Sequence, residues 1–187
     1  MSNGFGDGLW QDLDARLELL SELVLNMLNY SRTAPLERIS FCPNTATRQV
    51  VEVLSPRAQR HGGTIRLSLD PEVQPLLADK AALQRALVNI VNNAIEAAPG
   101  GQVDVATRWD VEGHRFVVTV SDQGPGIPAE LREKVFEAFF TTKGARGTGL
   151  GLAVSRKLVE EMGGHIWIES APSAGTTVAI ALPAEAT

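Results

Sequence analysis

The stretch "GTGLGL", residues 147–152, places glycine at every second position, between "TTKGAR" and the helical pattern of "AVSRKLVEEMGG". Three glycines cost backbone entropy and stabilise nothing by themselves, so we expect a functional reason for them. The stretch is not a P-loop, because Lys143 precedes the glycines, and Leu152 stands where a dinucleotide fingerprint needs glycine. We predict a mobile loop that runs into a helix N-terminus, where free N–H groups together with Lys143 and Arg146 attract phosphate.

Helical and strand patterns alternate around this loop. We predict helices over 44–60, with Asn44 as the N-cap, 79–98, 128–139 and 151–162, and strands over 64–70, 101–110, 114–122, 165–170 and 176–183. The turns "VEGH" and "APSAG" favour antiparallel hairpins. The mixture predicts an α+β fold, a two-layer sandwich in which helices cover one face of a mostly antiparallel sheet.

Length and composition limit the classes of protein to consider. The 187 residues suffice for one domain and an extra element. A net charge of -5 argues against non-specific nucleic-acid binding. No apolar run approaches the ~20 residues of a membrane span, and the N-terminus lacks a signal peptide. We therefore expect a cytoplasmic chain with a lone thiol at Cys42. This expectation is compatible with a membrane anchor elsewhere in a parent protein.

The N-terminal segment has a different pattern. Residues 1–9 are expected to form a flexible leader and residues 10–34 a helix that Pro35 ends. An apolar heptad seam runs through Leu13, Leu17, Leu20, Val24, Met27 and Ser31. Either this helix lies on its own domain or it dimerises. The regular seam favours a homodimer through residues 10–32.

Two clusters carry polar side chains of possible chemical use. On the predicted helix 83–98, Asn89, Asn92 and Asn93 share one side with Arg85 and Glu96. Because asparagine is a mediocre helix former, the amides indicate either a solvated face or oxygens aimed at a metal ion or phosphate-bound water.

The second cluster is "SDQGPGIP", residues 121–128. Asp122 ends a predicted strand, and Gly124 and Gly126 permit a tight turn. The stretch is either a plain turn or a carboxylate set in a pocket to accept a hydrogen bond from the amino group of a base.

Together these patches resemble the ATP-binding catalytic domain of bacterial sensor histidine kinases, in the superfamily of gyrase, Hsp90 and MutL. "NIVNNAIEAA" (89–98) looks like the N box, "DQGPG" (122–126) like the G1 box, "VFEAFF" (135–140) like the F box and "GTGLGL" like the G2 box. The ending "GGHIWIESAPSAGTTVAIALP" is also similar, so the resemblance covers about residues 40–184. It implies the Bergerat ATP-binding fold for a catalytic domain at 38–187.

The resemblance also implies roles for individual residues. Asn93 would be the Mg²⁺ ligand, Asn89 would line the phosphate site, Asp122 would read the adenine amino group, and Asn89, Asn93 and Lys143 would be the catalytic set. Residues 137–150 would form an ATP lid that closes and reopens. The expected nucleotide contacts are Asn89, Asn93, Asp122, Gly124, Gly126, Ile127, Phe140, Lys143, Gly147, Thr148, Gly149, Leu150, Gly151 and Thr176.

The expected activity is transfer of the γ-phosphoryl group of ATP to a histidine. Asn89 stands where hydrolysing relatives carry a glutamate, and a neutral amide is a poor general base. His61, His114 and His165 lie at predicted helix stops or a turn, so we expect the acceptor histidine on a dimerisation helix missing from this chain, with 10–32 resembling only the second such helix. A response regulator would be the downstream partner. The alternatives are a non-catalytic nucleotide-dependent interaction module and a slow ATPase.

Overall fold

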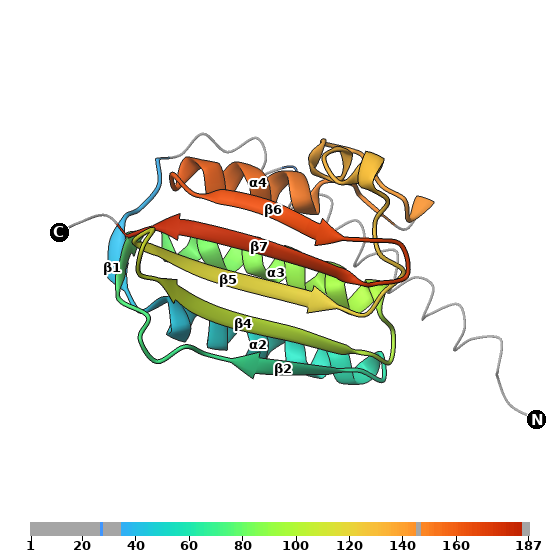
Figure 1. Cartoon of the computed structure of the whole chain (residues 1–187), viewed down its shortest axis with the longest axis horizontal. Helices are drawn as coiled ribbons and strands as arrows, with labels where there is room; N and C mark the ends of the chain where they lie inside the picture. The colour runs from blue at the N-terminus through green and yellow to red at the C-terminus, as the bar shows by residue number, and fades with distance from the viewer. Residues whose placement is uncertain (1–26, 28–34, 145–146, 185–187) are drawn as a thin grey trace, which may run out of the picture.

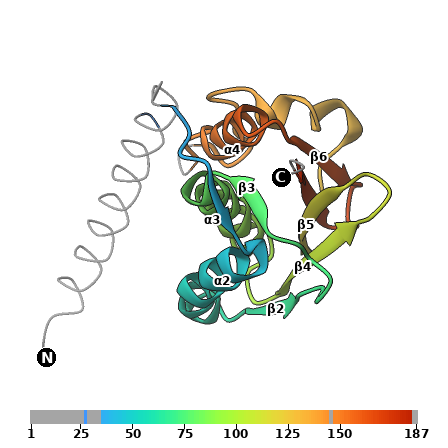
Figure 2. The same ribbon diagram turned by 90° about the vertical axis from the view of Figure 1, so that its left-hand side faces the viewer.

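A five-stranded sheet with three helices on one face forms the body of the protein (Figures 1 and 2). The computed structural model describes residues 27, 35–144 and 147–184. The strand order is β2 (Thr64–Ser68), β4 (Gln102–Asp110), β5 (Arg115–Asp122), β7 (Thr176–Pro183) and β6 (His165–Ser170). β2 and β4 run parallel, and the other neighbouring pairs of this sheet are antiparallel. The predicted α+β fold is confirmed.

The helices described on this face are α2 (Pro43–Arg60), α3 (Lys80–Ala97) and α4 (Gly151–Glu161). α3 lies between α2 and α4 against the sheet (Figure 2). Its apolar positions recur every three or four residues, so they form one stripe that the sheet buries. Leu83, Leu87, Ile90 and Val91 each expose no more than 1% of their surface. This stripe fixes how α3 is rotated about its axis.

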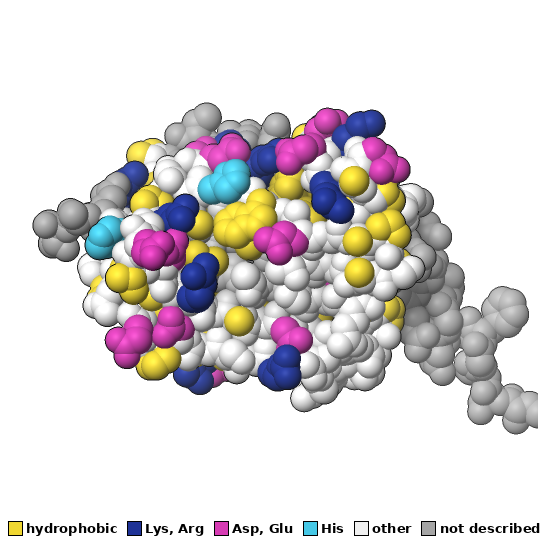
Figure 3. Space-filling model, in the orientation of Figure 1, with side chains coloured by type: hydrophobic (Ala, Val, Ile, Leu, Met, Phe, Trp, Pro, Cys, Tyr) yellow, Lys and Arg dark blue, Asp and Glu magenta, His cyan; other side chains and the backbone are white. Residues whose placement is uncertain are grey.

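The sheet is two-faced because side chains alternate along each strand. In β4, Val103, Val105 and Thr107 are buried, while the next side chain, Arg108, is exposed. No described helix covers the outer face of the sheet, where charges of both signs are scattered among hydrophobic and uncharged side chains (Figure 3). The functional groups of the N box and G1 box lie instead at the junction of sheet and helices.

The N-cap predicted at Asn44 is wrong by two residues. α2 begins at Pro43, with Cys42 in the N-cap position. Proline suits the first helical position because it has no N–H to leave unpaired. Asn44 has another use, since its Nδ2 donates to the Asp70 carbonyl at 2.8 Å and its Oδ1 accepts from Thr107 Oγ1 at 2.7 Å.

The helix predicted over 128–139 is also wrong. Two short 3₁₀ turns, Ala129–Leu131 and Lys134–Phe136, take its place. Phe136 is buried under the guanidinium of Arg156, which lies 4.2 Å from the ring centroid. Phe139 adopts a left-handed φ of 68°, which a right-handed helix cannot continue.

One feature was not predicted, and one prediction falls outside the described residues. β1 (Ile39–Phe41) and β3 (Leu76–Ala78) form a small antiparallel sheet that the patterns did not indicate. The leader 1–9 and, apart from Met27, the helix 10–34 lie outside the described residues, so these segments, their dimerisation and the boundary at 38 stay predictions. Along the described chain, no helix combines the length and apolarity needed to cross a bilayer.

Candidate functional site

A cavity of about 360 Å³ lies between α3, the ends of β5 and β7, and the segment that leads into α4. Ligand pockets usually have volumes of ~300–1,000 Å³. The predicted contact residues that line it are Asn89, Asn93, Asp122, Gly126, Ile127, Phe140, Lys143, Gly147, Thr148, Gly149, Gly151 and Thr176. Of that predicted set, Gly124 and Leu150 do not line the cavity. The Gly124 N–H donates a hydrogen bond to Asp122 Oδ1, and Leu150 is buried with 1% of its surface exposed.

Asp122 ends β5 directly opposite Thr176 of β7, so the sheet register brings the two side chains to one end of the cavity. Its Oδ1 accepts from the Gly124 N–H at 2.8 Å. Burial raises the pKa of the Asp122 carboxyl above its ordinary value, and hydrogen bonds from the backbones of Gly124 and Thr176 oppose this shift. Apolar side chains around it include Val120, Ile168 and Val178. This end suits a flat apolar ring with an amino group at its edge.

Ser170, which the sequence analysis did not single out, organises the same end. Its hydroxyl accepts from the Ile127 N–H at 2.8 Å and lies 2.7 Å from the Gly175 carbonyl, which can only accept. The Ser170 proton is thereby committed to Gly175. The Thr176 hydroxyl, 3.0 Å away, therefore donates to Ser170 and keeps its lone pairs available. The signal in the sequence was only a serine at a predicted strand end.

Two glycines are required by close backbone contacts around the cavity. Gly126 has a φ of 75°, and a Cβ added there would lie 1.9 Å from the Ala171 carbonyl oxygen. Gly149, in the middle of "GTGLGL", has a φ of 65°, and its Cβ would lie 2.4 Å from the backbone of Phe139. Side chains at either position would push apart the segments that form the cavity wall.

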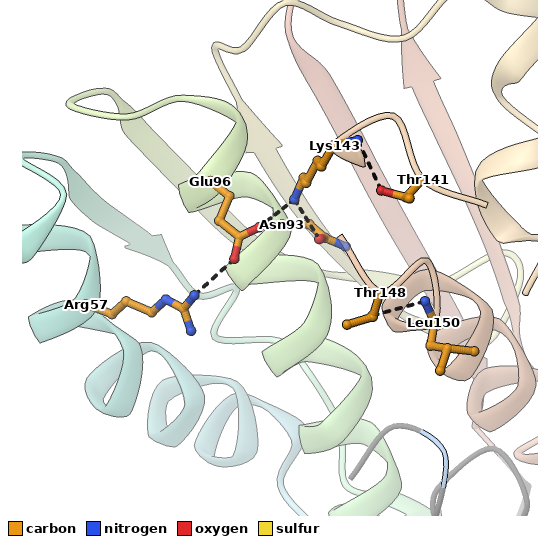
Figure 4. A network of polar contacts seen from close by, with 7 residues as sticks. All are labelled: Arg57, Asn93, Glu96, Thr141, Lys143, Thr148 and Leu150. Carbon is orange, nitrogen blue, oxygen red and sulfur yellow. Dashed lines mark hydrogen bonds and ion pairs between the residues drawn. The ribbon is translucent and has the colours of Figure 1, made fainter. Parts of the chain in front are cut away.

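The other end of the cavity is polar. Asn89 Nδ2 donates to the Gly151 carbonyl at 3.1 Å, so α3 holds the first residue of α4 against the cavity. The side chain of Asn93, one turn further along α3, accepts from the Lys143 ammonium at 3.2 Å (Figure 4). α4 begins here without a side-chain cap, which leaves backbone N–H donors for an anion.

Glu96 completes this end and was given no role in the sequence analysis. Its carboxylate bridges the Lys143 ammonium at 2.5 Å and the Arg57 guanidinium at 3.0 Å (Figure 4). Its spacing of three from Asn93 on a helix was the available signal, because such residues share a face. Asn92 belonged to the predicted amide cluster but does not line the cavity. The structure therefore brings together two of the three asparagines.

The three histidines lie elsewhere. His61 is the C-cap of α2, His114 sits in the β4–β5 turn with a φ of 45°, and His165 begins β6 and stacks on Trp167. All three are exposed and none lines the cavity.

Comparison with known proteins agrees with this geometry. Residues 78–186 match the family described as histidine kinase-, DNA gyrase B-, and HSP90-like ATPase. The C4-dicarboxylate transport sensor protein DctB of Rhizobium meliloti (strain 1021) is 40% identical over 144 residues, which are 74% of this chain and 23% of DctB. The chain spans about a quarter of the length of DctB and of two further curated relatives that it matches.

Solved structures give the same result. Full-length ShkA in complex with AMPPNP superimposes with a TM-score of 0.80 at 28% identity, over 95% of this chain and 37% of ShkA. The histidine kinase ThkA in complex with the response regulator protein TrrA has a TM-score of 0.80 at 28% identity, over 98% of this chain and 53% of ThkA.

We predict that Asp122→Asn lowers ATP affinity by about 10- to 150-fold without unfolding the domain. The loss corresponds to one charge-assisted hydrogen bond, about 1.5–3 kcal/mol. The amide oxygen of the substituted side chain can still accept from Gly124, and removal of a partly buried charge costs no stability. Titration calorimetry and thermal unfolding measure the two effects.

The pH dependence provides a control. Since the pKa of Asp122 is raised, its carboxylate is protonated at a higher pH than an ordinary aspartate, and wild-type ATP affinity falls as the pH drops through that pKa. The ATP affinity of the Asp122→Asn variant should not show this fall, because an amide does not titrate in this range. Unchanged ATP affinity in the variant would disprove the role of Asp122.

Proposed function

Since the chain belongs to the family of histidine kinase-, DNA gyrase B-, and HSP90-like ATPases and is an ATP-binding domain of the sensor histidine kinase type, we propose that it transfers the γ-phosphoryl group of ATP to a histidine on a partner segment. The observation that carries this proposal is the pairing, in one cavity, of a half-buried carboxylate with a cation-holding amide. The first suits a base and the second suits a polyphosphate with its metal.

Within the proposal, ATP lies along the cavity. Its adenine occupies the apolar end, where Asp122 accepts from the exocyclic amino group and the Thr176 hydroxyl oxygen offers a second acceptor. Its phosphates extend toward the N-terminus of α4, whose free N–H groups and helix dipole favour negative charge. Lys143 adds a positive charge on the lid side.

The polar end fits Mg²⁺ because it already holds a cation. The Lys143 ammonium lies on Asn93 Oδ1 and a Glu96 oxygen, so these atoms favour positive charge. Among the described residues, no three His, Cys, Asp or Glu side chains form a metal cage, which suits an ion held mostly by phosphates and water. We assign Asn93 as the metal-holding residue. When bound, the ion would neutralise charge that develops on the phosphates.

Transfer is favoured over hydrolysis by the role of Asn89. Its amide nitrogen donates to Gly151, and a neutral amide cannot take a proton from water. This argues against the slow ATPase alternative. What the chain supplies is position: α3 holds Asn89 and Asn93, and α4 presents its N-terminus. Positioning and electrostatics account for most of the catalysis of phosphoryl transfer.

The partners follow from the same proposal. A histidine-bearing dimerisation helix would deliver the acceptor, and a response regulator would receive the phosphoryl group. ThkA, in its complex with TrrA, gives a precedent for the second partner. We further propose that residues 10–32 dimerise and that the domain works in the cytoplasm, where ATP is available.

Asn93→Ala should weaken ATP binding by more than about fivefold in Mg²⁺ and by less than about twofold in EDTA. The side-chain oxygen would be one of few protein ligands of an ion that keeps several waters. Calorimetry in the two buffers measures this. Asn92→Ala is the matched control, because Asn92 lies outside the cavity lining. Equal losses in both buffers would remove Asn93 from the metal site.

The labelling experiment tests the activity itself. The isolated chain should bind ATP but not label itself, because its three histidines lie outside the cavity. With γ-labelled ATP and Mg²⁺, acid-labile phosphate should appear only on an added protein that carries dimerisation helices with a histidine. At ATP concentrations below saturation, the label should be weaker with the Asp122→Asn chain. Stoichiometric label on the chain alone would contradict the proposal. Phosphate release without any labelling of the added protein would favour the ATPase alternative.

A further inference from the structure

Glu96 lies between two cations, one from the body of the domain and one from the lid. Arg57 of α2 contacts one carboxylate oxygen at 3.0 Å, and Lys143 contacts the other at 2.5 Å (Figure 4). About a third of each of the three side chains is exposed. The lid lysine is thus docked on α3.

The same ammonium also covers the amide assigned to the metal. Lys143 Nζ lies 3.2 Å from Asn93 Oδ1. Two cations repel strongly when they share one oxygen ligand. Lys143 in this position and a metal ion on Asn93 are therefore alternatives, and one must leave before the other binds.

We propose that Glu96 is a positioning residue: it holds Lys143 on Asn93 while nucleotide is absent and releases it to the phosphates when nucleotide binds. This inference rests on the proposed function, because it uses the phosphate and metal positions assigned above. It adds a role for Glu96 and a sequence of events in which Lys143 leaves Asn93 before the metal occupies it.

Arg57 explains how Lys143 can leave at little cost. With both cations in place, the three side chains carry a net charge of +1. When Lys143 departs, Arg57 still pairs with Glu96, so no carboxylate is left uncompensated. The phosphates, with several negative charges, compete effectively for the ammonium. Lys143 reaches Glu96 from a segment in which its own N–H is bonded to Thr141 Oγ1 at 3.1 Å.

The docked lysine also lowers the apparent affinity for nucleotide, because binding must first break the Lys143–Glu96 contact. Partly exposed ion pairs alter equilibria by about two- to fivefold. Removal of the Glu96 charge should therefore loosen the free lid and tighten ATP binding. If the Lys143–Glu96 contact only stabilised the site, its loss would weaken ATP binding instead.

The first measurement is hydrogen exchange of the lid amides at 142–144 and 147–149 without nucleotide. Glu96→Gln and Lys143→Met should each speed exchange about two- to fivefold, and the double variant should be no faster than the single ones. Asp104→Asn is the matched control. It breaks an ion pair with Arg66 at the far edge of the sheet, and the Asp104 and Glu96 side chains are 31% and 32% exposed. Unaltered lid exchange in Glu96→Gln would overturn the proposal.

The second measurement is ATP affinity in EDTA, by calorimetry. Glu96→Gln should tighten binding about two- to fivefold in the wild-type background and by less than about 1.5-fold in the Lys143→Met background. An equal gain in both backgrounds would mean that Glu96 acts by general repulsion of phosphate, and would overturn the proposal. A loss of affinity in Glu96→Gln would overturn it as well.

These outcomes separate this inference from the proposed function. If the wild-type chain failed to bind ATP, the proposed function would fall, and this inference with it. If ATP bound as proposed but the double-variant cycles were additive, only the role of Glu96 would fall. Lys143→Met is a substitution in an exposed segment, so its effect on the lid is measurable even if a variant of α3 proved unstable.

Discussion

The packing of α3 against the sheet is the contact on which the site depends. Leu87, Ile90 and Val91 are buried almost completely, and this fixes the rotation of the helix. The same rotation turns Asn89, Asn93 and Glu96 toward the lid and the start of α4. A helix held less firmly could not keep two amides and a carboxylate in fixed positions at one cavity. The packing of α3 therefore both stabilises the fold and positions the side chains of the site.

The register of β5 and β7 supplies the other half of the site. It places Asp122 beside Thr176 at the sheet end, while Ser170 fixes the direction of the Thr176 hydroxyl. The cavity therefore has an apolar end with acceptors and a polar end with donors and cations. Adenosine triphosphate has the complementary polarity. The glycines at 126 and 149 serve this arrangement by allowing close backbone approach rather than by looseness alone.

Much of this arrangement could be predicted from periodicity and from the four boxes. The apolar stripe of 83–98 and the alternating strands indicated the layers, and the order of the boxes indicated the cavity residues. Local sequence patterns did not predict the features that depend on tertiary contacts. Asn44 bonds Asp70 and Thr107 instead of capping a helix, and Phe136 packs under Arg156 in a segment that helix propensity favoured. The partners of Glu96 lie 39 and 47 residues away, beyond any local pattern.

The central claim is that ATP lies between the sheet end and the lid, and amide chemical shifts test it most directly. On addition of ATP and Mg²⁺ to ¹⁵N-labelled protein, the largest shifts should fall on the backbone N–H groups of residues 122–124, 126–127, 147–152 and 176. Those of Arg66 in β2 and Arg108 in β4, whose side chains are exposed, should not move. Largest shifts on those strands, or no shifts at saturating ATP, would contradict this account.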